Sequence, residues 1–474
     1  MCSPSLTERA EKTTSGAPEG PPVPDDRWLR GDGLQWQLDA FLIKDAHALL
    51  PLHGDMTAFG YRMRWGYMLL LLGLIAPCTD DFYGASLWGS RRKPPHHRRP
   101  VRREASEAVE AVADPEDGPW SADAKMAPIG VALIGGGLFA KQEHMPALMK
   151  CDNLALKAIY SRSLKSAKET AALNTRSEAT PDLYSADSGP GKSYDDLLAR
   201  DDIAAVILAL PIPSQPAHIE AALAAGKHVL AEKPLAPSVD AGKKLIDYYR
   251  DVAESKGVTF AIAENFRFKP VFEYAAAEAA KLGKVEHFSV RVFYYMGQDT
   301  QWYGTEWRAK PEFQGGFLLD GGVHFTAATR MLLTGHESRA AEVTAFTAQV
   351  QAHLPPIDTV NAVVRLESGV SGTYQQSCGT RLSASAWEFG YERGTVCVVG
   401  DKVTVTPRGG DQTVKEFERT SGVSEEVAAW ATALVEGKSD ERQAVDKALG
   451  DLEMLELMFE SGLNGGEVKK FKHQ

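Results

Sequence analysis

The chain of 474 residues has few cysteines, no excess of positive charge and no long apolar run. Its five cysteines are dispersed, without a C-x-x-C pair or a His/Cys cluster at metal-ligand spacing, so we expect no metal site and reduced thiols in the cytoplasm. The net charge of −11 argues against a nucleic-acid partner, because such proteins need a basic surface to neutralise phosphates. The length and composition indicate an ordinary soluble protein of two or three domains.

The first 125 residues differ in composition from the rest. Residues 1–35 are rich in Pro, Gly, Ser and charge, and this extension is predicted to be mostly disordered. The apolar run 65–76 falls short of the roughly 20 residues that a spanning helix needs, so we expect no membrane partner. The basic run 91–103 indicates either a nuclear-import or nucleic-acid patch or, as we favour, a solvated linker. A chain starting at Met126 would hold the whole folded part, which leaves the preceding region as an appended segment or an artefact of the gene model.

The most informative stretch is a glycine turn between a predicted strand and a predicted helix. The apolar residues 129–134 run into the sequence GGGLFA, and a helical pattern over 138–149 follows. This G-x-G-x-x-A arrangement is typical of a dinucleotide site, where the glycines allow a tight turn and a close approach of the pyrophosphate to the helix N-terminus. A glycine-rich turn without a ligand is the alternative. The residues of the turn that we expect to bind the cofactor are Gly135, Gly137, Leu138 and Phe139.

The residues after the second predicted strand, 154–160, indicate which dinucleotide binds. An acidic side chain at that position would bind the ribose hydroxyls of NAD, but the sequence has Ser161, Arg162 and Ser163. A guanidinium can fork onto a 2′-phosphate, and serine hydroxyls can donate to it. We therefore predict NADP, with NAD possible; the alternative is that Arg162 is only an exposed loop residue.

Strand and helix patterns alternate up to residue 263, which predicts a doubly wound parallel sheet of α/β type. Ligands of such sheets bind at the carboxyl ends of the strands, where the segments 161–162, 211 and 232–234 lie. The rest of the chain has strand patterns joined by short turns, which predict a mostly antiparallel sheet. These strands are expected at 285–295, 341–351, 359–366, 370–377, 385–391 and 394–399, with helical stretches at 320–333 and 424–461.

Several sequence blocks, taken in order, make residues 128 to about 470 resemble the glucose–fructose oxidoreductase / inositol dehydrogenase / rhizopine-catabolism (Gfo/Idh/MocA) family. The resemblance implies a Rossmann domain over 126–264 and an α/β domain with a large open sheet over 265–474. That sheet commonly mediates assembly in the family, so a homodimer or homotetramer is expected. The blocks are Gly135–Gly137, His144–Leu148, Ala225–Pro234, Glu264–Phe268, Trp307–Arg308 and Gly315–His324.

The resemblance implies roles for three residues. Lys233 corresponds to a lysine that contacts nicotinamide and the substrate hydroxyl, often before a cis proline, and Asp320 and His324 correspond to a substrate-site pair in which the histidine exchanges a proton. The chemistry of the residues agrees, because histidine titrates near working pH and an i, i+4 pair shares one helix face. Asp320 could then orient the imidazole or bind a hydroxyl. The alternatives are a helix N-terminal carboxylate and a core histidine.

Other residues are expected around the cofactor and the substrate because they match family blocks or strand ends. Trp302 and Tyr303 could stack on a sugar face or simply pack. The further cofactor-binding candidates are Leu210, Pro211, His218, Glu232, Asn265, Trp307 and Arg308, and Arg267 is also expected to line the site.

Together these patterns predict an NADP-dependent oxidoreductase that transfers a hydride between nicotinamide and a sugar, polyol or related hydroxy or carbonyl compound. The alternative is a sensor, since some members of the family bind dinucleotide without catalysis. The presence of Lys233, Asp320 and His324 favours the enzyme.

Overall fold

The computed structural model describes residues 127–176 and 180–474. The predicted disorder before residue 126, the apolar run 65–76 and the basic run 91–103 lie outside the described residues. In the part that is described, no helix has both the length and the apolar character needed to cross a membrane.

The first sheet has six strands, all parallel, in the order β3-β2-β1-β4-β5-β6. The chain moves outward from β1 to β3 and then returns to the other side of β1, so the strand order reverses between β1 and β4, where α/β sheets bind their ligands. The prediction of a doubly wound parallel sheet is thus confirmed. The strands are β1 (Ile129–Ile134), β2 (Leu154–Ser161), β3 (Asp182–Ser185), β4 (Ala205–Leu208), β5 (His228–Glu232) and β6 (Phe260–Ala263).

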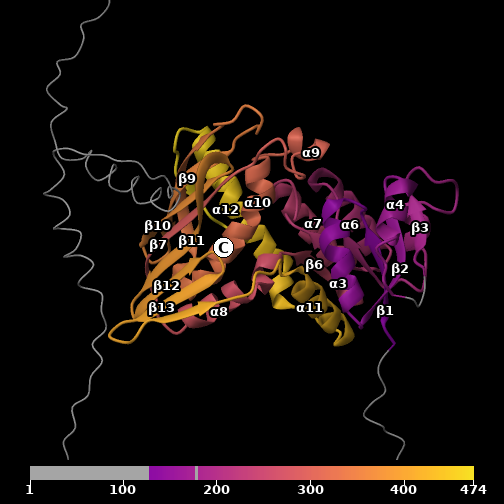
Figure 1. Cartoon of the computed structure of the whole chain (residues 1–474), viewed down its shortest axis with the longest axis horizontal. Coiled ribbons are helices and arrows are strands. Elements are labelled where there is room, and N and C mark those ends of the chain that lie inside the picture. The colour runs from indigo at the N-terminus through magenta and orange to yellow at the C-terminus, as the bar shows by residue number, and fades with distance from the viewer. Residues whose placement is uncertain (1–126, 177–179) are drawn as a thin grey trace, which may run out of the picture. The chain divides into compact units, whose positions relative to one another are not determined.

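Helices cover both faces of this sheet, which explains why its central strands are continuous apolar runs with every residue of β4 and β6 buried. One core joins the sheet to α3 and α11, and the other joins it to α5, α6 and α7 (Figure 1). The helices are η1 (Ala140–His144), α3 (Met145–Lys150), α4 (Leu164–Ala171), α5 (Tyr194–Leu198), η2 (Ile212–Ser214), α6 (Gln215–Ala224), α7 (Val239–Val252), η3 (Glu254–Lys256) and α11 (Val423–Val435).

The second sheet has nine strands in the order β14-β13-β12-β11-β7-β10-β9-β8-β15. Every neighbouring pair is antiparallel except β10 and β7, so the predicted, mostly antiparallel sheet is confirmed. The strands are β7 (Val285–Tyr295), β8 (Ala340–Ala348), β9 (Thr359–Leu366), β10 (Ser371–Ser377), β11 (Gly379–Tyr391), β12 (Gly394–Val399), β13 (Lys402–Pro407), β14 (Thr413–Glu416) and β15 (Lys469–Lys470).

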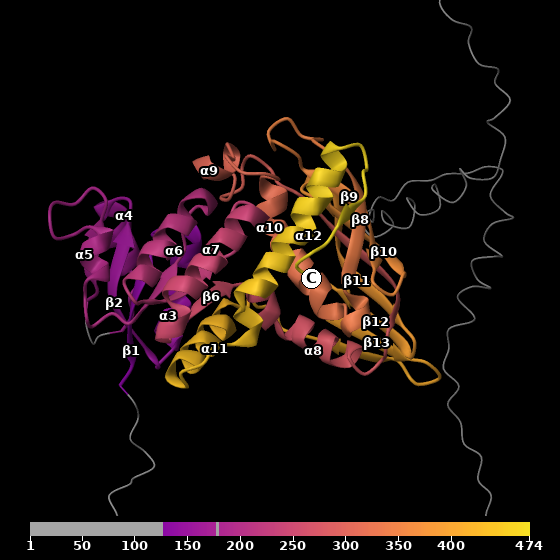
Figure 2. The same ribbon diagram turned by 180° about the vertical axis from the view of Figure 1, so that it is seen from behind.

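Among the described residues, helices pack on one face of this second sheet. Alternate residues of β9 are buried and exposed, as expected for a sheet with one face on the core. The remaining helices are η4 (Asn265–Phe268), α8 (Pro270–Ala279), α9 (Glu306–Ala309), α10 (Phe317–Leu332), η5 (His336–Ser338), η6 (Glu441–Gln443) and α12 (Val445–Leu463). Of these, α12 contacts β8 as well as α7 and β6, and it lies between the two sheets in both views (Figures 1 and 2).

The prediction of one continuous helical stretch over 424–461 is wrong, because the structure has two helices there. The chain breaks after α11, where Gly437 has a left-handed φ of 65°, and a short turn leads into α12. Glycine is the residue that ends a helix in this conformation at least cost. The break lets α11 pack on the first sheet while α12 packs between the two sheets.

Candidate active site

A cleft of about 620 Å³ runs along the carboxyl ends of β1, β2, β4 and β5 and continues to α9 and the start of α10. It therefore lies at the reversal of strand order and extends toward the second sheet. The lining residues are Gly135–Ala140, Ser161–Ser163, Ser166, Ala209–Pro213, Glu232, Lys233, Gly304–Arg308, Lys310, Glu312 and Asp320.

The glycine turn at the end of β1 forms one wall of the cleft. Gly135 has a φ of 126°, and a Cβ there would clash with the carbonyl oxygen of Ala209. A Cβ on Gly137 would meet nothing within 4 Å, so the backbone at this position is open. The helix begins directly after it, since Lys141 N donates to the Gly137 carbonyl at 3.1 Å. A tight turn, an open backbone and a helix N-terminus together fit the pyrophosphate of a dinucleotide.

At the end of β2, the cleft is lined by hydroxyl groups and one guanidinium. Ser161, Arg162, Ser163 and Ser166 all line it, and no lining residue of this segment is acidic. The exposed side chain of Arg162 is free to reach a ligand, whereas the Ser166 hydroxyl donates to the Gly136 carbonyl at 2.7 Å. This end of the cleft therefore carries positive charge where the ribose of a bound dinucleotide would lie.

Lys233 projects from the end of β5 onto the first turn of α10. Its Nζ donates to the Asp320 carbonyl at 2.8 Å and to Asp320 Oδ1 at 3.0 Å. The Lys233–Pro234 peptide is cis, as the family resemblance implied. Lys233 is thus fixed as a hydrogen-bond donor and cation across the cleft between the two parts of the fold.

Asp320 is buried and binds two cations at once. Arg308 Nε donates to Asp320 Oδ2 at 2.7 Å, on the opposite oxygen from Lys233. Burial raises the pKa of Asp320, but the charges of Lys233 and Arg308 outweigh burial and hold this pKa well below its usual range. Asp320 is therefore an anion at every working pH. It accepts hydrogen bonds from Lys233 and Arg308 and carries no proton to transfer.

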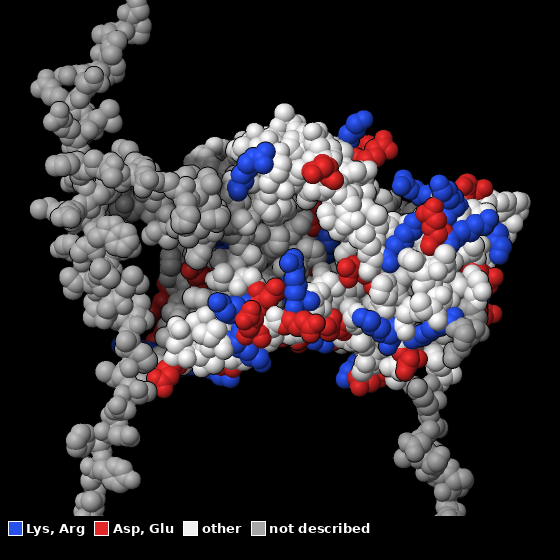
Figure 3. Space-filling view, in the orientation of Figure 1, with Lys and Arg blue, Asp and Glu red and all other residues white. Residues whose placement is uncertain are grey.

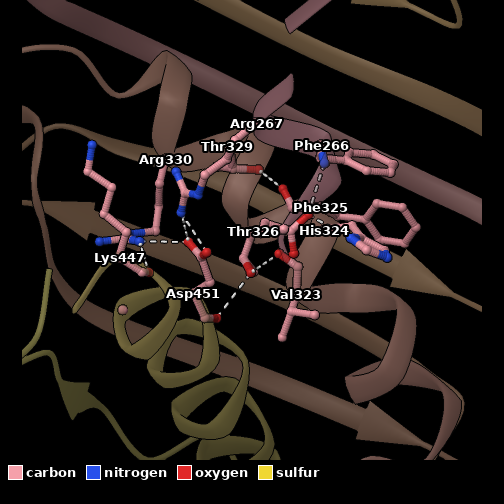
Figure 4. Close-up of polar contacts among 12 residues, drawn as sticks. Phe266, Arg267, Val323, His324, Phe325, Thr326, Thr329, Arg330, Lys447 and Asp451 are labelled. Carbon is pink, nitrogen blue, oxygen red and sulfur yellow. Dashed lines mark hydrogen bonds and ion pairs between the residues drawn. The ribbon is translucent and has the colours of Figure 1, made fainter. Parts of the chain in front are cut away.

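His324 lies one turn further along α10 and pairs with a different carboxylate. Its Nδ1 is 2.6 Å from Glu264 Oε1, and its ring stacks on Phe266 at a centroid distance of 4.8 Å (Figure 4). Burial raises the pKa of Glu264, but His324, Arg267 and Lys233 outweigh burial and lower it overall. A proton on His324 Nδ1 would donate to the ionised Glu264, and Nε2 would then be the ring nitrogen that faces away from this carboxylate.

Sequence reasoning missed Glu264. The i, i+4 spacing suggested that Asp320 could orient the imidazole, but Asp320 is engaged by Lys233 and Arg308, and Glu264 is the carboxylate beside His324. Glu264 follows β6 directly, so its position at a strand end was a signal in the sequence.

The predicted cofactor contacts divide into two groups. Those that line the cleft are Gly135, Gly137, Leu138, Phe139, Ser161, Arg162, Leu210, Pro211, Glu232, Lys233, Trp307 and Arg308. His218 and Asn265 are not among the lining residues. The His218 ring packs against Tyr194 at a centroid distance of 5.0 Å, and Asn265 Nδ2 donates to the Ser421 carbonyl at 2.5 Å. Arg267, which is buried, and His324, which is half-buried, are likewise not among the lining residues.

The segment that precedes α10 faces the glycine turn across the cleft. The guanidinium carbon of Arg308 lies 4.0 Å from the Trp307 ring centroid and 5.3 Å from that of Trp302. Trp302 in turn lies 6.5 Å from the ring of Phe139, and Gln142 Nε2 donates to Gln301 Oε1 at 2.9 Å. These contacts give the cleft an aromatic and cationic wall beside Asp320.

A buried ion cluster supports His324 from behind (Figure 4). Asp451 on α12 accepts from Arg267 Nη2 at 2.5 Å and from Arg330 Nη1 at 2.6 Å. Thr326 Oγ1 donates to the Asp451 carbonyl at 3.0 Å. The cluster therefore ties η4, α10 and α12 together around the helix that carries Asp320 and His324.

Replacing Asp451 with Ala is expected to destabilise the fold by about 3–5 kcal/mol, because the buried Arg267 and the half-buried Arg330 would remain without their anion. Chemical denaturation of the purified variants measures this. Asp446 is the matched control on the same helix, since its pair with Arg250 is exposed. Asp446→Ala should cost about 0–1 kcal/mol. An equal effect of the two substitutions would contradict the assigned role of the cluster.

The described residues show neither a surface patch of one charge on the face in view (Figure 3) nor a cluster of metal-binding side chains. On the face shown in Figure 3, Lys and Arg are interspersed with Asp and Glu. Within residues 127–176 and 180–474, no group of three or more His, Cys, Asp or Glu side chains could hold a metal ion.

The fold and the cleft define a dinucleotide-binding protein with a lysine, a carboxylate and a histidine near the end of the nucleotide groove. Two family models match this chain: an oxidoreductase family with an NAD-binding Rossmann fold over residues 129–263, and the GFO/IDH/MocA C-terminal domain over 274–406. The chain belongs to the Gfo/Idh/MocA family and is an oxidoreductase with a nicotinamide dinucleotide cofactor.

Named relatives agree with this assignment. A dehydrogenase named FPY6 from Fusarium mangiferae is 38% identical over 73% of this chain and 100% of its own length. The D-xylose 1-dehydrogenase (NADP(+)) 2 of Haloferax volcanii is 26% identical over 67% of this chain and 96% of its own. Among solved structures, an oxidoreductase from Thermotoga maritima has a TM-score of 0.63 at 27% identity, covering 72% of this chain and 98% of its own.

Proposed function

We propose that the protein is an NADP-dependent oxidoreductase that transfers a hydride between nicotinamide and a sugar, polyol or related hydroxy or carbonyl compound in the cytoplasm. The observation that carries this proposal is the convergence of Lys233, Asp320 and Arg308 in one cleft with the glycine turn. The name of the Haloferax relative, which acts on a pentose with NADP, supports the substrate class. The proposed domains are 126–264 for the dinucleotide and 265–474 for the substrate and assembly.

In the proposed mechanism, the residues of this chain bind oxygen and move one proton. The bound nicotinamide supplies or accepts the hydride. Lys233 donates a hydrogen bond to the reacting oxygen, and its ion pair with Asp320 holds Lys233 in place. His324 takes the hydroxyl proton at Nε2 during oxidation and returns it during reduction, while Glu264 fixes the ring through Nδ1. The aromatic rings of Trp302 and Trp307 offer faces on which a sugar ring can stack.

Several further contacts are proposed for the cofactor. The glycine turn holds the pyrophosphate, Leu210 and Pro211 flank the dinucleotide at the end of β4, and Trp307 and Arg308 close the nicotinamide end. Ser161 and Arg162 bind the 2′-phosphate, because this segment offers hydroxyls and a guanidinium in place of a carboxylate.

Arg162→Ala is expected to weaken NADPH binding by at least roughly tenfold and to leave NADH binding unchanged, because a charge-assisted contact of roughly 1.5–3 kcal/mol is lost. Fluorescence titration of both cofactors measures the two affinities. Lys165→Ala is the matched control, since Lys165 is an exposed cation close by on α4. Equal losses for NADPH and NADH, or tighter binding of NADH by the native protein, would contradict the NADP assignment.

We also propose that the protein forms a homodimer or homotetramer through the face of the second sheet on which no described helix packs. Phe346 on β8 is 66% exposed and Val363 on β9 is 45% exposed, although each alternates with core residues. Phe346→Asp with Val363→Asp should reduce the mass measured by light scattering to that of a monomer. Leu173→Asp, an exposed leucine beside the first sheet, is the control and should leave the assembly intact. A native monomer would contradict the proposal.

The test of the activity is a screen of the purified full chain with NADPH and with NADP against sugars, polyols and aldehydes. We expect NADP-linked turnover of at least one hydroxy or carbonyl compound. Tight binding of NADPH without turnover on a broad panel would favour a dinucleotide sensor instead.

A further inference from the structure

Among the described residues, a buried acid behind the cleft has no cationic partner. Glu426 on α11 is fully buried, and neither of its carboxyl oxygens has a hydrogen-bond partner among the described residues. Burial, followed by the nearby charges of Glu232 and Glu264, raises the pKa of Glu426 well above its usual value. An ionised carboxylate in this position would be desolvated and repelled by both neighbours, and both effects favour the neutral acid.

Three other side chains around α11 also end in buried polar atoms without partners. They are Trp430 Nε1, one turn beyond Glu426, Gln443 Oε1 and His144 Nδ1. Their elements are in contact, because α11 packs on η1 and Gln443 Nε2 donates to the Glu426 carbonyl at 3.3 Å. A buried water typically bridges about three such groups. These orphaned donors and acceptors on contacting elements are the kind of groups that a buried water would bridge.

The two carboxylates that influence Glu426 belong to histidine pairs beneath the cleft. His144 Nε2 lies 2.7 Å from Glu232 Oε1, and Glu232 immediately precedes Lys233. His324 Nδ1 lies 2.6 Å from Glu264 Oε1. His144 is brought inward by a π-helical turn, a feature that often occurs at functional sites. Glu426 is therefore coupled to the carboxylates behind both Lys233 and His324.

We propose that Glu426 is a positioning residue for the reaction: as a neutral acid it donates through buried water to the Glu232 and Glu264 carboxylates and keeps both anionic beside their histidines. Its role in turnover rests on the proposed function, whereas its protonation does not. Without this donor, the Glu264 carboxylate holds the Nδ1 proton of His324 more strongly, and the imidazole becomes more basic.

Among the charged groups near α11, Glu232 and Glu264 have the main influence on the pKa of Glu426. Lys141 is paired with Glu169, and Glu143 accepts from Ser421. The charged or titratable side chains on the elements packed against α11 are Lys141, Glu143 and His144 on η1, Lys150 on α3, Arg267 on η4, and Glu441 and Arg442 on η6.

The direct test is infrared spectroscopy of the full chain near neutral pH, native and Glu426→Gln. The native protein should show a protonated-carboxyl C=O band that shifts in D₂O and is missing from the Gln variant. Because the pKa of Glu426 is raised from 4.5 on folding, the native protein should also lose thermal stability relative to Glu426→Gln as the pH rises. That difference should grow by roughly 5–10 °C between about pH 5 and 8, because the carboxyl stays protonated in the folded state over most of this range while it is ionised in the unfolded state. A missing band or a constant difference would overturn the neutral acid.

The positioning role is tested on a confirmed substrate by the pH profile of kcat/KM. Glu426→Gln keeps a neutral donor, so kcat/KM should fall on the acid side of the profile (its acid limb) at the same pH as in the native protein. In Glu426→Ala this fall should occur about one pH unit higher. Loss of activity in Glu426→Ala without a shifted limb would mean a structural role only and would overturn the proposal. If Glu426→Ala does not fold, an acid limb shifted in Glu426→Gln overturns it equally. Absence of any native turnover would instead count against the proposed function, and the infrared result would stand separately.

Discussion

Lys233→Met is expected to lower turnover by about 10²–10⁴-fold while NADPH still binds, because the substitution keeps the apolar stem and removes the donor to the reacting oxygen. In the native protein, Lys233 Nζ contacts both the carbonyl and the carboxylate of Asp320. Steady-state kinetics on a confirmed substrate and NADPH titration of the same preparation separate the two effects.

The matched control is Lys243→Met, an exposed lysine on α7 that pairs with Asp247 away from the cleft. It should behave as the native enzyme. Near-native turnover of Lys233→Met would contradict its assignment, and a parallel loss of NADPH binding would mean that Lys233 acts mainly on the cofactor.

His324→Ala is expected to produce a loss of similar size, about 10²–10⁴-fold in kcat, with a distorted pH profile because the proton acceptor is gone. Glu264→Gln should reduce kcat through the same group, since an amide beside Nδ1 can no longer stabilise the imidazolium that forms when Nε2 takes the proton. The double variant should be no worse than His324→Ala alone, because the two residues act as one unit. Additive losses, or a native profile in His324→Ala, would show that Glu264 and His324 act independently.

Much of the first sheet was predictable because its strands carry strong local signals. The apolar runs 129–134 and 204–210 are bounded by glycine or proline and correspond to β1 and β4. β3 was not anticipated, because Asp182–Ser185 is a short edge strand with polar ends and little periodicity. In the second sheet, β14 was missed for a similar reason, since all four of its residues are exposed.

The site residues that belong to a sequence motif were predictable. The contacts between side chains from different helices and strands were less so. Lys233 and Asp320 could be placed from their motifs, but the partner of His324 depends on how η4 packs against α10. Spacing along a helix shows that Asp320 and His324 share a face, and it says nothing of which carboxylate approaches from another element. The pairing of Asp320 with Arg308 likewise depends on the fold of a loop with no regular pattern.

The measurement that tests hydride transfer most directly is the fate of deuterium from NADPH that is labelled at the transferring position of nicotinamide. With the native protein and a carbonyl compound from the screen, we expect mass spectrometry to find one deuterium on the new carbinol carbon. Lys233→Met and His324→Ala should form this product about 10²–10⁴-fold more slowly. Tight NADPH binding without deuterium in any product would contradict an oxidoreductase role and leave the protein as a dinucleotide sensor.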